Sequence, residues 1–297
     1  MYLVIRLTLL FACLLVCFSS TACSEAEECV PHNSWQLGLA VGLGIKTNPL
    51  VGGDDIPLVL LPDIAWYGEN AYFDNAELGY QWINDSMVSV ETFVQVDNEA
   101  AFFSFLHPVN ILISGDTGTS LDINEPDADD APMPPDDSEV ENPNKFLSID
   151  NIANRNWAIN GGIRLHYFVA NSEFTLAGLT DVSGVHKGQQ VEFAYQYKWQ
   201  WHTTRFNAKL GASWKSAALI DYYYGVSEQD TQHSELFFSG QAGWQPHMNI
   251  SVQHPINNHW MWIANAGYSK LPDSLYRSPL IQNNHVERIF LGVAYRY

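Results

Sequence analysis

Strict alternation between apolar and polar residues over long segments constrains the fold of this chain more than any other feature of its sequence. In residues 191–201 every second position is Val, Phe, Tyr or Trp, and the positions between them are Glu, Ala, Gln or Lys. The same two-residue period runs through 35–45, 157–167 and 206–214. A period of two places one set of side chains on each face of a β-strand. The sequence therefore predicts an all-β protein built from long strands.

Three features favour a transmembrane barrel over a soluble sandwich, which would also alternate. The segments run for roughly ten to thirteen residues, which is the length of a tilted membrane strand. Their apolar face is rich in Trp and Tyr near the strand ends, as an interfacial aromatic girdle requires. The opposite face carries Gln, Asn, Lys, Glu and Gly, which suits a polar lumen. We therefore expect an antiparallel transmembrane β-barrel.

Loop lengths supply an independent test of this architecture. The predicted strands lie at 35–46, 58–67, 72–84, 87–97, 101–113, 156–169, 173–184, 189–201, 204–216, 246–255, 258–269 and 286–297. Gaps after the even-numbered strands are short, 97–100 among them, whereas every long gap follows an odd-numbered strand. Bacterial barrels have an even strand count, short periplasmic turns and long outer loops. The pattern predicts about 12 strands, with 85–86 and 185–188 as short outer loops.

The N-terminus has the features of an export signal. Arg6 precedes an apolar run over 7–18 that is too short to span a bilayer but suits a signal-peptide core. We expect a signal peptide over 1–22, a periplasmic leader over 23–34 and the barrel over 35–297. Lipidation of Cys23 is an alternative to simple cleavage, although Ser20 stands where a lipoprotein signal usually has Leu. Cys23 and Cys29 either form a small-loop disulfide or stay unpaired in the leader.

The charge balance excludes one class of partner. The chain has 33 Asp and Glu against 14 Lys and Arg, for a formal net charge of −19 at pH 7. Nucleic acid is therefore not expected as a partner, because phosphate neutralisation requires a basic surface.

The last six residues, Gly-Val-Ala-Tyr-Arg-Tyr at 292–297, point to the outer membrane. Gly292 with Tyr295 and the terminal Tyr297 resembles the signal that the barrel-assembly machinery reads on a last strand. Phe290 departs from the polar residue that usually stands two positions before the glycine. We expect a Gram-negative outer-membrane location, with outer-membrane lipid, lipopolysaccharide and the assembly machinery as partners.

Further motifs resemble those of the MipA/OmpV family of outer-membrane proteins, from about Trp35 to Tyr297. They are Asn-Pro-Leu-Val-Gly-Gly-Asp-Asp at 48–55, Leu-Leu-Pro-Asp-Ile at 60–64, Asp-Val-Ser-Gly at 181–184 with His-Lys-Gly at 186–188, Asp-Tyr-Tyr-Tyr-Gly-Val at 221–226 and Ser-Pro-Leu at 278–280. The resemblance implies an outer-membrane barrel. In one member it implies a scaffold that brings a lytic murein transglycosylase to a bifunctional penicillin-binding synthase. Other members are known only as outer-membrane antigens or osmotically regulated proteins.

The outer loop at 114–155 is longer and more acidic than this family leads us to expect. Its carboxylates and prolines, concentrated between 116 and 143, cannot bury enough apolar surface to fold alone. Two readings stay open, a solvated loop and a loop that captures Ca²⁺ or Mg²⁺ at the level of lipopolysaccharide. The spacing lacks the glycine and terminal glutamate of an EF-hand, which favours the solvated loop.

Two polar or aromatic clusters are candidate functional sites. Tyr222-Tyr223-Tyr224 is either a stacking surface or contact with an inward-folded loop at the outer rim, or it packs in the interfacial girdle. Ser183, His186 and Asp181 include the residue types of an acyl hydrolase. A glycine-containing turn explains that run more simply.

The histidines supply weaker candidates. His202-Thr203-Thr204 lacks the serine of a hydrolase, and His254 with His259 is poor support for a metal site. We therefore assign no catalytic, cofactor-binding or metal-binding residues, and we expect a protein that is not an enzyme.

The favoured function is an anchoring platform for cell-wall machinery, with a murein transglycosylase and a penicillin-binding synthase as partners. The alternative is a narrow pore or small-solute channel, whose lumen Arg164, Lys198, Lys209 and Glu192 would partly fill. A third class is surface recognition through the long outer loops.

Overall fold

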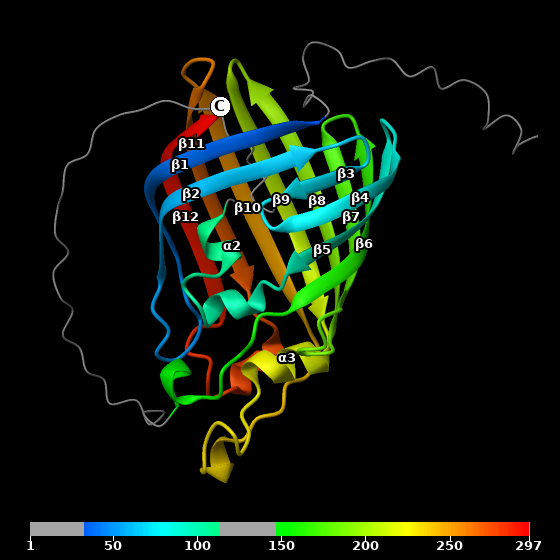
Figure 1. Ribbon diagram of the computed structural model, residues 1–297. Coiled ribbons are helices and arrows are strands. Elements are labelled where there is room, and N and C mark those ends of the chain that lie inside the picture. Colours follow the sequence, from blue (N-terminus) through cyan, green and yellow to red (C-terminus); the bar gives the residue numbers. More distant parts are fainter. Residues whose placement is uncertain (1–32, 113–146, 297) are drawn as a thin grey trace, which may run out of the picture. The chain divides into compact units, whose positions relative to one another are not determined.

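The computed structural model describes residues 33–112 and 147–296, and these fold as a closed antiparallel β-barrel (Figure 1). Its strands follow one another around the wall, and the last pairs with the first. They are β1 (Ser34–Lys46), β2 (Ile56–Tyr67), β3 (Ala71–Asp74), β4 (Glu77–Asn84), β5 (Val88–Val96), β6 (Ile159–Val169), β7 (Ser172–Asp181), β8 (Gln189–Trp201), β9 (Thr204–Lys215), β10 (Gly243–Pro255), β11 (Trp260–Lys270) and β12 (His285–Arg296). The predicted fold class is confirmed.

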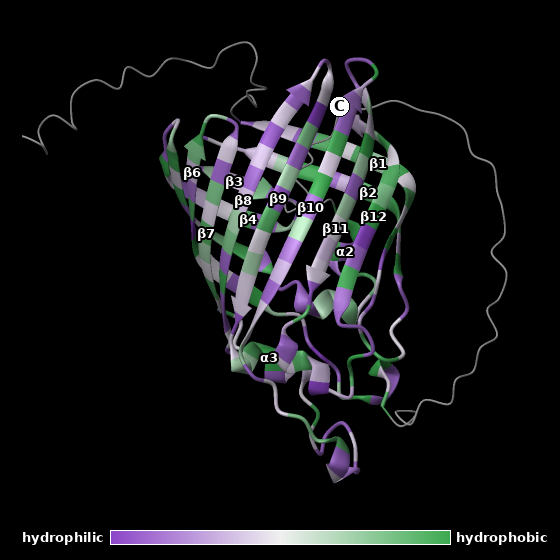
Figure 2. Cartoon of the chain, turned by 180° about the vertical axis from the view of Figure 1, so that it is seen from behind, coloured by the Kyte–Doolittle hydropathy of each residue, from purple (hydrophilic) through white to green (hydrophobic). Residues whose placement is uncertain are grey.

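The two faces of the wall follow the alternation in the sequence. On β1 the odd-numbered apolar residues from Trp35 to Ile45 are exposed on the outside, while the even-numbered Ala40 and Lys46 are buried inside. Figure 2 shows the resulting alternation of hydrophobic and hydrophilic residues along the strands. Apolar side chains on the outside of a barrel are matched to lipid rather than to water.

Long loops leave one end of the barrel and short turns leave the other. The short turns span 68–70, 85–87, 170–171, 202–203 and 256–259. By the usual arrangement of bacterial barrels, the short-turn end faces the periplasm; the opposite end is called the outer end below.

The predicted strand at 101–113 is wrong. The chain after β5 instead forms two short helices, η1 (Glu99–Phe102) and α2 (Pro108–Ile111). Pro108 occupies the first turn of α2, where its missing N–H costs nothing, and His107 caps the helix by accepting a hydrogen bond from Val109 N at 3.3 Å. Residues 97–112, called the insert below, therefore begin at the outer end, and the prediction of a periplasmic turn at 97–100 is also wrong.

The predicted strand at 72–84 is two strands, β3 and β4. Asn75 and Ala76 between them have φ of 44° and 74°, which reverses the chain within the wall. Residues 85–87 consequently lie at the periplasmic end rather than in the predicted outer loop. One strand lost and one strand gained leave the predicted strand count unchanged.

The wall is incomplete on one side of β2. This strand pairs with β1 along its length but with β3 only through Ala65–Tyr67. Among the described residues no strand pairs with the remaining edge at 56–63, and α2 packs against β2. Pro57 and Pro62 suit an unpaired edge, because proline has no N–H to donate to a ladder.

The outer loops fold together into a cap with its own hydrophobic core. Helix α3 (Ala217–Tyr224) contributes Leu219, Ile220, Tyr223 and Tyr224, all completely buried. Other members of this core come from the β1–β2, β5–β6, β9–β10 and β11–β12 loops, the insert and the start of β12: Leu50, Ala100, Phe102, Leu147, Val226, Leu271, Leu275, Leu280 and Val286. Three short helices, η3 (Ile149–Asn151), η4 (Ser234–Leu236) and η5 (Asp273–Arg277), complete the cap. Burial of each Leu, Ile, Val or Phe side chain in this core contributes roughly 1.5–3 kcal/mol.

Phe290 faces the lumen and packs closely against glycines. A Cβ added to Gly42 or Gly292 would lie 2.8 Å from the Phe290 ring, so only glycine leaves room for it. The ring belongs to an inner apolar cluster with Ala40, Ile56, Leu58, Met261, Ile263 and Ala294. An aromatic residue in place of the usual polar residue at this position therefore fills one side of the lumen.

Several predictions fall outside the described residues. These are the signal peptide over 1–22, nearly all of the leader over 23–34, the pairing of Cys23 with Cys29, and the acidic run between 116 and 143. In the part of the chain that is described, no helix is long and apolar enough to cross a membrane.

Candidate functional site

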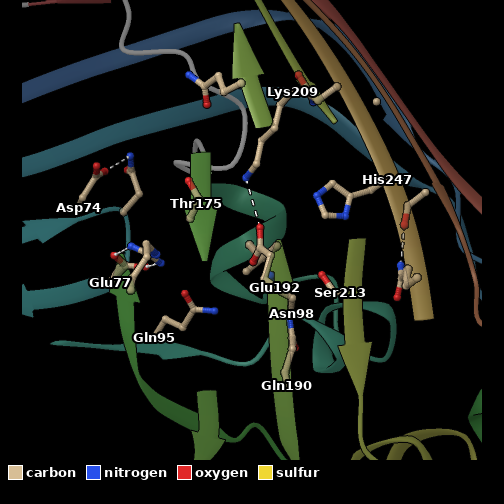
Figure 3. Close-up of a pocket in the computed structure, with 18 of the residues that line it drawn as sticks. Asp74, Glu77, Gln95, Asn98, Thr175, Gln190, Glu192, Lys209, Ser213 and His247 are labelled. Atoms are coloured by element: carbon tan, nitrogen blue, oxygen red, sulfur yellow. Dashed lines mark hydrogen bonds and ion pairs between the residues drawn. The ribbon is translucent and has the colours of Figure 1, made fainter. Parts of the chain in front are cut away.

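The lumen contains a cavity of about 510 Å³. Its lining comes from strands all around the wall, β1 and β2 included, and from the insert, and it is dominated by polar and charged side chains (Figure 3). Of the four predicted lumen residues, Arg164, Lys209 and Glu192 line this cavity, whereas Lys198 is not part of its lining and its side chain is 59% exposed.

Arg164 is the centre of the largest charged group in the cavity. Its Nη1 donates to Glu77 Oε1 and Glu91 Oε1, both at 2.7 Å, and its Nη2 donates to Glu77 Oε2 at 2.7 Å. The guanidinium also lies 3.8 Å from the centre of the Phe93 ring. Such a two-pronged pair holds both partners in fixed orientations.

The charged group continues along the wall from β5 to β8. His166 Nδ1 lies 2.8 Å from Glu173 Oε1, and His166 Nε2 lies 3.4 Å from Glu91 Oε1. Lys198 Nζ reaches Glu173 Oε2 at 3.1 Å. Opposite charges therefore alternate across neighbouring strands, which lowers the cost of holding them inside the barrel.

Glu99 lines the cavity at its outer end. Lys215 Nζ and the Tyr224 hydroxyl donate to its two carboxylate oxygens. Burial, followed by the charge of Glu99, raises the pKa of Tyr224 well above its usual value, so the phenol stays a donor. Beside it, Lys46 Nζ donates to Asn110 Oδ1 at 3.0 Å. These contacts fasten the insert to both the wall and the cap.

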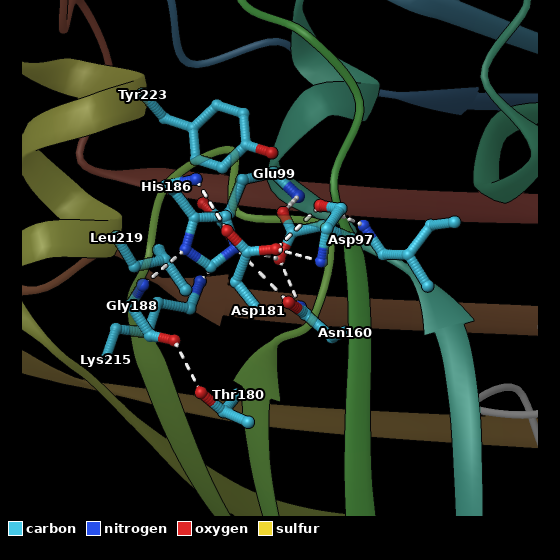
Figure 4. A network of polar contacts seen from close by, with 12 residues as sticks. Asp97, Glu99, Asn160, Thr180, Asp181, His186, Gly188, Lys215, Leu219 and Tyr223 are labelled. Carbon is cyan, nitrogen blue, oxygen red and sulfur yellow. Dashed lines mark hydrogen bonds and ion pairs between the residues drawn. The ribbon is translucent and has the colours of Figure 1, made fainter.

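A second buried network lies between the insert and the β7–β8 loop (Figure 4). Asn160 Nδ2 donates to Asp97 Oδ2 at 2.5 Å, and His186 Nε2 lies 3.2 Å from Asn160 Oδ1. Burial alone would raise the pKa of Asp97, but His186 and the Glu99 backbone N–H hold it below its usual value. Burial, and then the charge of Asp97, raises the pKa of Tyr223.

The predicted hydrolase candidates do not form a nucleophile with its base. Ser183 Oγ donates to Asp181 Oδ1 at 2.6 Å and accepts from Ile159 N at 3.1 Å. Asp181 also accepts from the backbone N–H groups of residues 183, 184, 186 and 187. Both His186 nitrogens have other partners, since Nδ1 accepts from Gly188 N at 2.9 Å. The cluster therefore shapes a loop.

The three tyrosines lie on α3 and fasten the cap. Tyr224 contacts Glu99, and the Tyr223 ring lies 5.8 Å from the His186 ring. The Tyr222 hydroxyl accepts from Asn156 N at 2.9 Å. Through Glu99, Tyr224 contacts the insert, which folds into the barrel. This arrangement corresponds to one of the expected alternatives, contact with an inward-folded loop.

The remaining histidine candidates each contact a different neighbour. His202 lies in the β8–β9 turn, His254 Nδ1 lies 2.9 Å from Thr204 Oγ1, and His259 stacks on Tyr295. Within 33–112 and 147–296, no group of three or more His, Cys, Asp or Glu side chains is placed to hold a metal ion.

Sequence reasoning missed Asp97, Glu99 and Asn110. The apolar runs from Ala100 to Phe103 and from Ile111 to Ile113 favour a turn followed by a strand in this segment. The one available signal was two carboxylates directly before an apolar run, which a lipid-facing strand would not carry.

The periplasmic end presents two projecting hairpins, β8–β9 and β10–β11 (Figure 1). Trp201 is 67% exposed on the first, with its ring 5.3 Å from that of His202, and Ile256 is 46% exposed on the second.

Comparison with known proteins places the chain in a family. The family profile described as MltA-interacting protein MipA matches residues 39–297. The "Putative outer membrane protein YiaT" of Escherichia coli K12 is 32% identical over 118 residues, 39% of this chain and 48% of that protein. The "MltA-interacting protein" of the same organism is 26% identical over 124 residues, 41% of this chain and 49% of that protein. The chain thus spans about half the length of the curated relatives it matches.

Solved structures give only distant likenesses. The CymD monoaromatic hydrocarbon channel superposes with a TM-score of 0.37 at 10% identity, covering 90% of this chain and 88% of that one. The Pseudomonas putida toluene transporter TodX gives 0.34 at 9% identity, covering 90% of each chain. The family match extends over most of the barrel, and the chain belongs to the MipA family of outer-membrane proteins.

Proposed function

We propose that this barrel is a non-enzymatic scaffold that presents its periplasmic end to murein-remodelling enzymes. The observation that carries the proposal is the cap, whose buried core and Glu99 contacts cover the outer end of the lumen. When the outer end is covered in this way, the periplasmic end is the end of the barrel that can contact periplasmic proteins. The relative named for interaction with MltA, a murein transglycosylase, supports this choice of partner.

The surface that we assign to the partner is the pair of hairpins β8–β9 and β10–β11, and in particular Trp201 and Ile256. Both side chains are exposed although they are apolar. Exposed Trp is enriched among the residues that dominate protein–protein binding energies. Because these two hairpins project beyond the other turns of the periplasmic end, a partner would contact mainly their tips (Figure 1).

Capture of a purified MltA-type transglycosylase on the immobilised barrel tests the proposal. We expect retention by the unmodified barrel, and about tenfold weaker binding by the Trp201→Ala, Ile256→Ala double variant, the loss typical of hot-spot residues. Trp82→Ala is the matched control, because Trp82 is 64% exposed on β4, away from these hairpins. Failure of the unmodified barrel to retain the transglycosylase would contradict the scaffold. An equal loss of transglycosylase binding in the double variant and in the Trp82→Ala control would contradict the assignment of the partner surface to these hairpins.

The expectation of no enzymatic activity is part of the proposal. It is supported by the positions of Ser183 and His186, which have partners other than each other.

A narrow pore is the second candidate, and the lumen cavity is the observation that favours it. Solute passage through the barrel would require the cap and the insert to move together, because Glu99 joins them.

The last strand is also proposed to be the segment that the assembly machinery reads. Its pairing with β1 from Arg288 to Arg296 is what closes the barrel.

A further inference from the structure

The charged side chains of the lumen cavity are largely paired with one another. Arg164 is bound by Glu77 and Glu91, Lys209 Nζ lies 3.4 Å from Glu192 Oε1, and Lys215 is bound by Glu99. A charged ligand would have to compete with these pairs for one partner and leave the other uncompensated. Removing one member of a buried pair is costly, so the cavity disfavours ions.

Five uncharged polar side chains of the same cavity have no such partner in the described part of the chain, whereas others, such as Asn75, Gln245 and Asn249, are hydrogen-bonded to neighbouring side chains. Gln95, Asn98, Gln190, Gln196 and Ser213 line it, and their side chains make no hydrogen bond to any other described residue. Figure 3 shows Gln95, Asn98, Gln190 and Ser213 around one stretch of the lumen. They come from β5, the insert, β8 and β9, so their donors and acceptors converge from several sides.

Aromatic rings complete the lining. Tyr67 and Tyr72 stack with their ring centres 6.2 Å apart, and their hydroxyls are held by Asp74 at 2.8 Å and Glu77 at 2.7 Å. Because the hydroxyls are engaged, the rings offer mainly their apolar surfaces to the cavity.

Convergent amides, neutralised charges and aromatic surface together describe a site for an uncharged ligand rich in hydroxyl groups. Each amide side chain supplies a donor and an acceptor, as each hydroxyl of a sugar does. The volume of 510 Å³ lies within the range of small-molecule sites, about 300–1,000 Å³. We propose that the cavity binds a short, neutral oligosaccharide, which enters from the periplasmic end because the cap covers the outer end.

This proposal is independent of the scaffold function. Loss of sugar binding would leave the hairpin tips unchanged, and loss of transglycosylase capture would leave the cavity unchanged. The two are therefore distinguishable in the same purified protein.

Calorimetry on the purified barrel tests the proposal, in a detergent whose headgroup is not a sugar. The probes are maltotriose and triacetylchitotriose, with citrate and spermidine as anionic and cationic comparisons. We expect saturable binding of at least one sugar and none of either ion. Gln190→Leu with Gln196→Leu should weaken sugar binding by about tenfold or more, since buried sugar hydroxyls would lose their partners.

Gln200→Leu is the matched control, because Gln200 lies on the same strand and the same face but outside the cavity lining. Folding of each variant is checked by its migration as a compact barrel without heating. Absence of saturation by both sugars up to the order of 10 mM, a concentration that reveals even weak complexes, overturns the proposal. Binding of an ion in preference to the sugars, or equal affinity in all variants, overturns it as well.

Discussion

Tyr224 donates a hydrogen bond to the carboxylate of Glu99, and this contact joins the cap to the insert across 125 residues of sequence. Both side chains are buried, and Lys215 holds the other carboxylate oxygen. The outer closure of the barrel therefore depends on a polar contact at the centre of a hydrophobic core. Loss of either partner leaves a buried polar atom without its hydrogen bond.

Tyr224→Phe should loosen the cap without unfolding the barrel. The buried Glu99 oxygen loses its donor, which costs roughly 1–3 kcal/mol. Amide hydrogen exchange in α3 and η1 should accelerate about tenfold or more, while exchange in β8 and β9 stays unchanged. Tyr222→Phe is the control, because the Tyr222 hydroxyl contacts an exposed backbone N–H. Unaltered exchange in α3 of the Tyr224 variant would show that this contact does not hold the cap.

Gly42→Ala should destabilise the barrel by forcing Phe290 and β12 away. The added Cβ would lie 2.3 Å from the Leu291 carbonyl oxygen as well as 2.8 Å from the ring. Overpacking of this kind costs about 1–3 kcal/mol. The measurement is the urea midpoint of unfolding in detergent. Gly178→Ala provides the comparison, since nothing lies within 4 Å of its added Cβ, and it should leave the midpoint unchanged or raise it. Equal midpoints for the two variants would refute the close packing of Phe290.

The insert should loosen in acid because of His107. Burial, and then the nearby charge of Lys46, lowers the pKa of His107 to about 4, while Asp97 acts in the opposite direction. The unfolded insert therefore binds a proton more readily than the folded one. Stability is fully present above pH 6.5 and is lost as the pH falls toward 4, at up to about 1.4 kcal/mol per pH unit.

Trp157 reports this transition, because its ring lies 4.8 Å from that of His107. Its fluorescence, taken as the difference from a Trp157→Phe variant, should change between pH 6.5 and 4. His107→Asn keeps a side-chain acceptor for the Val109 N–H but cannot take up a proton, so its profile should be flat. Matching profiles for the two proteins would exclude His107 as the cause.

Leu106 should face lipid beside the unpaired edge of β2. It is 69% exposed, Phe105 next to it is 57% exposed, and His107 contacts Trp157, which stands two residues before the outward-facing Ile159. A spin label on Leu106→Cys should be relaxed by oxygen more than by a water-soluble nickel complex. A label on Phe237→Cys in the cap should show the reverse order. Preferential relaxation of the Leu106 label by nickel would place the insert away from the bilayer.

The sequence predicted most of the wall because alternation is enforced separately on every strand. On each strand one face must be apolar because it contacts lipid, and the other is polar because it lines the lumen. The bounds of β1, β8 and β9 consequently agree with the prediction to within one residue. The errors in the prediction lie in segments that are not divided between a lipid face and a lumen face. The first part of the insert packs inside the barrel, so Ala100 and Phe102 owe their apolar character to contact with the cap core rather than with lipid.

The reversal at Asn75 and Ala76 was missed for a different reason. Asn tolerates a positive φ but Ala has no such preference, so nothing in the pair marks a turn. Only the tertiary hydrogen bonds of Asn75, to Ile64 N at 2.9 Å and to Asp63 Oδ1 at 2.7 Å, show why the chain turns there.

The strand residues that line the cavity were predictable from the sequence, but the contacts of Glu99 that cover its outer end were not. Arg164, Lys209 and Glu192 alternate with lipid-facing residues, so their place in the lumen follows from the period of the strands. Glu99 meets Lys215 and Tyr224 only because loops distant in sequence converge. No local pattern encodes that meeting.

Conductance across a planar bilayer tests the closed outer end most directly. The purified, unmodified barrel should insert without discrete channel openings, because the cap core and Glu99 cover the lumen. Insertion is verified independently by protease protection of the wall. Regular single-channel openings by the unmodified barrel would contradict the closed barrel, and with it the observation that carries the scaffold proposal.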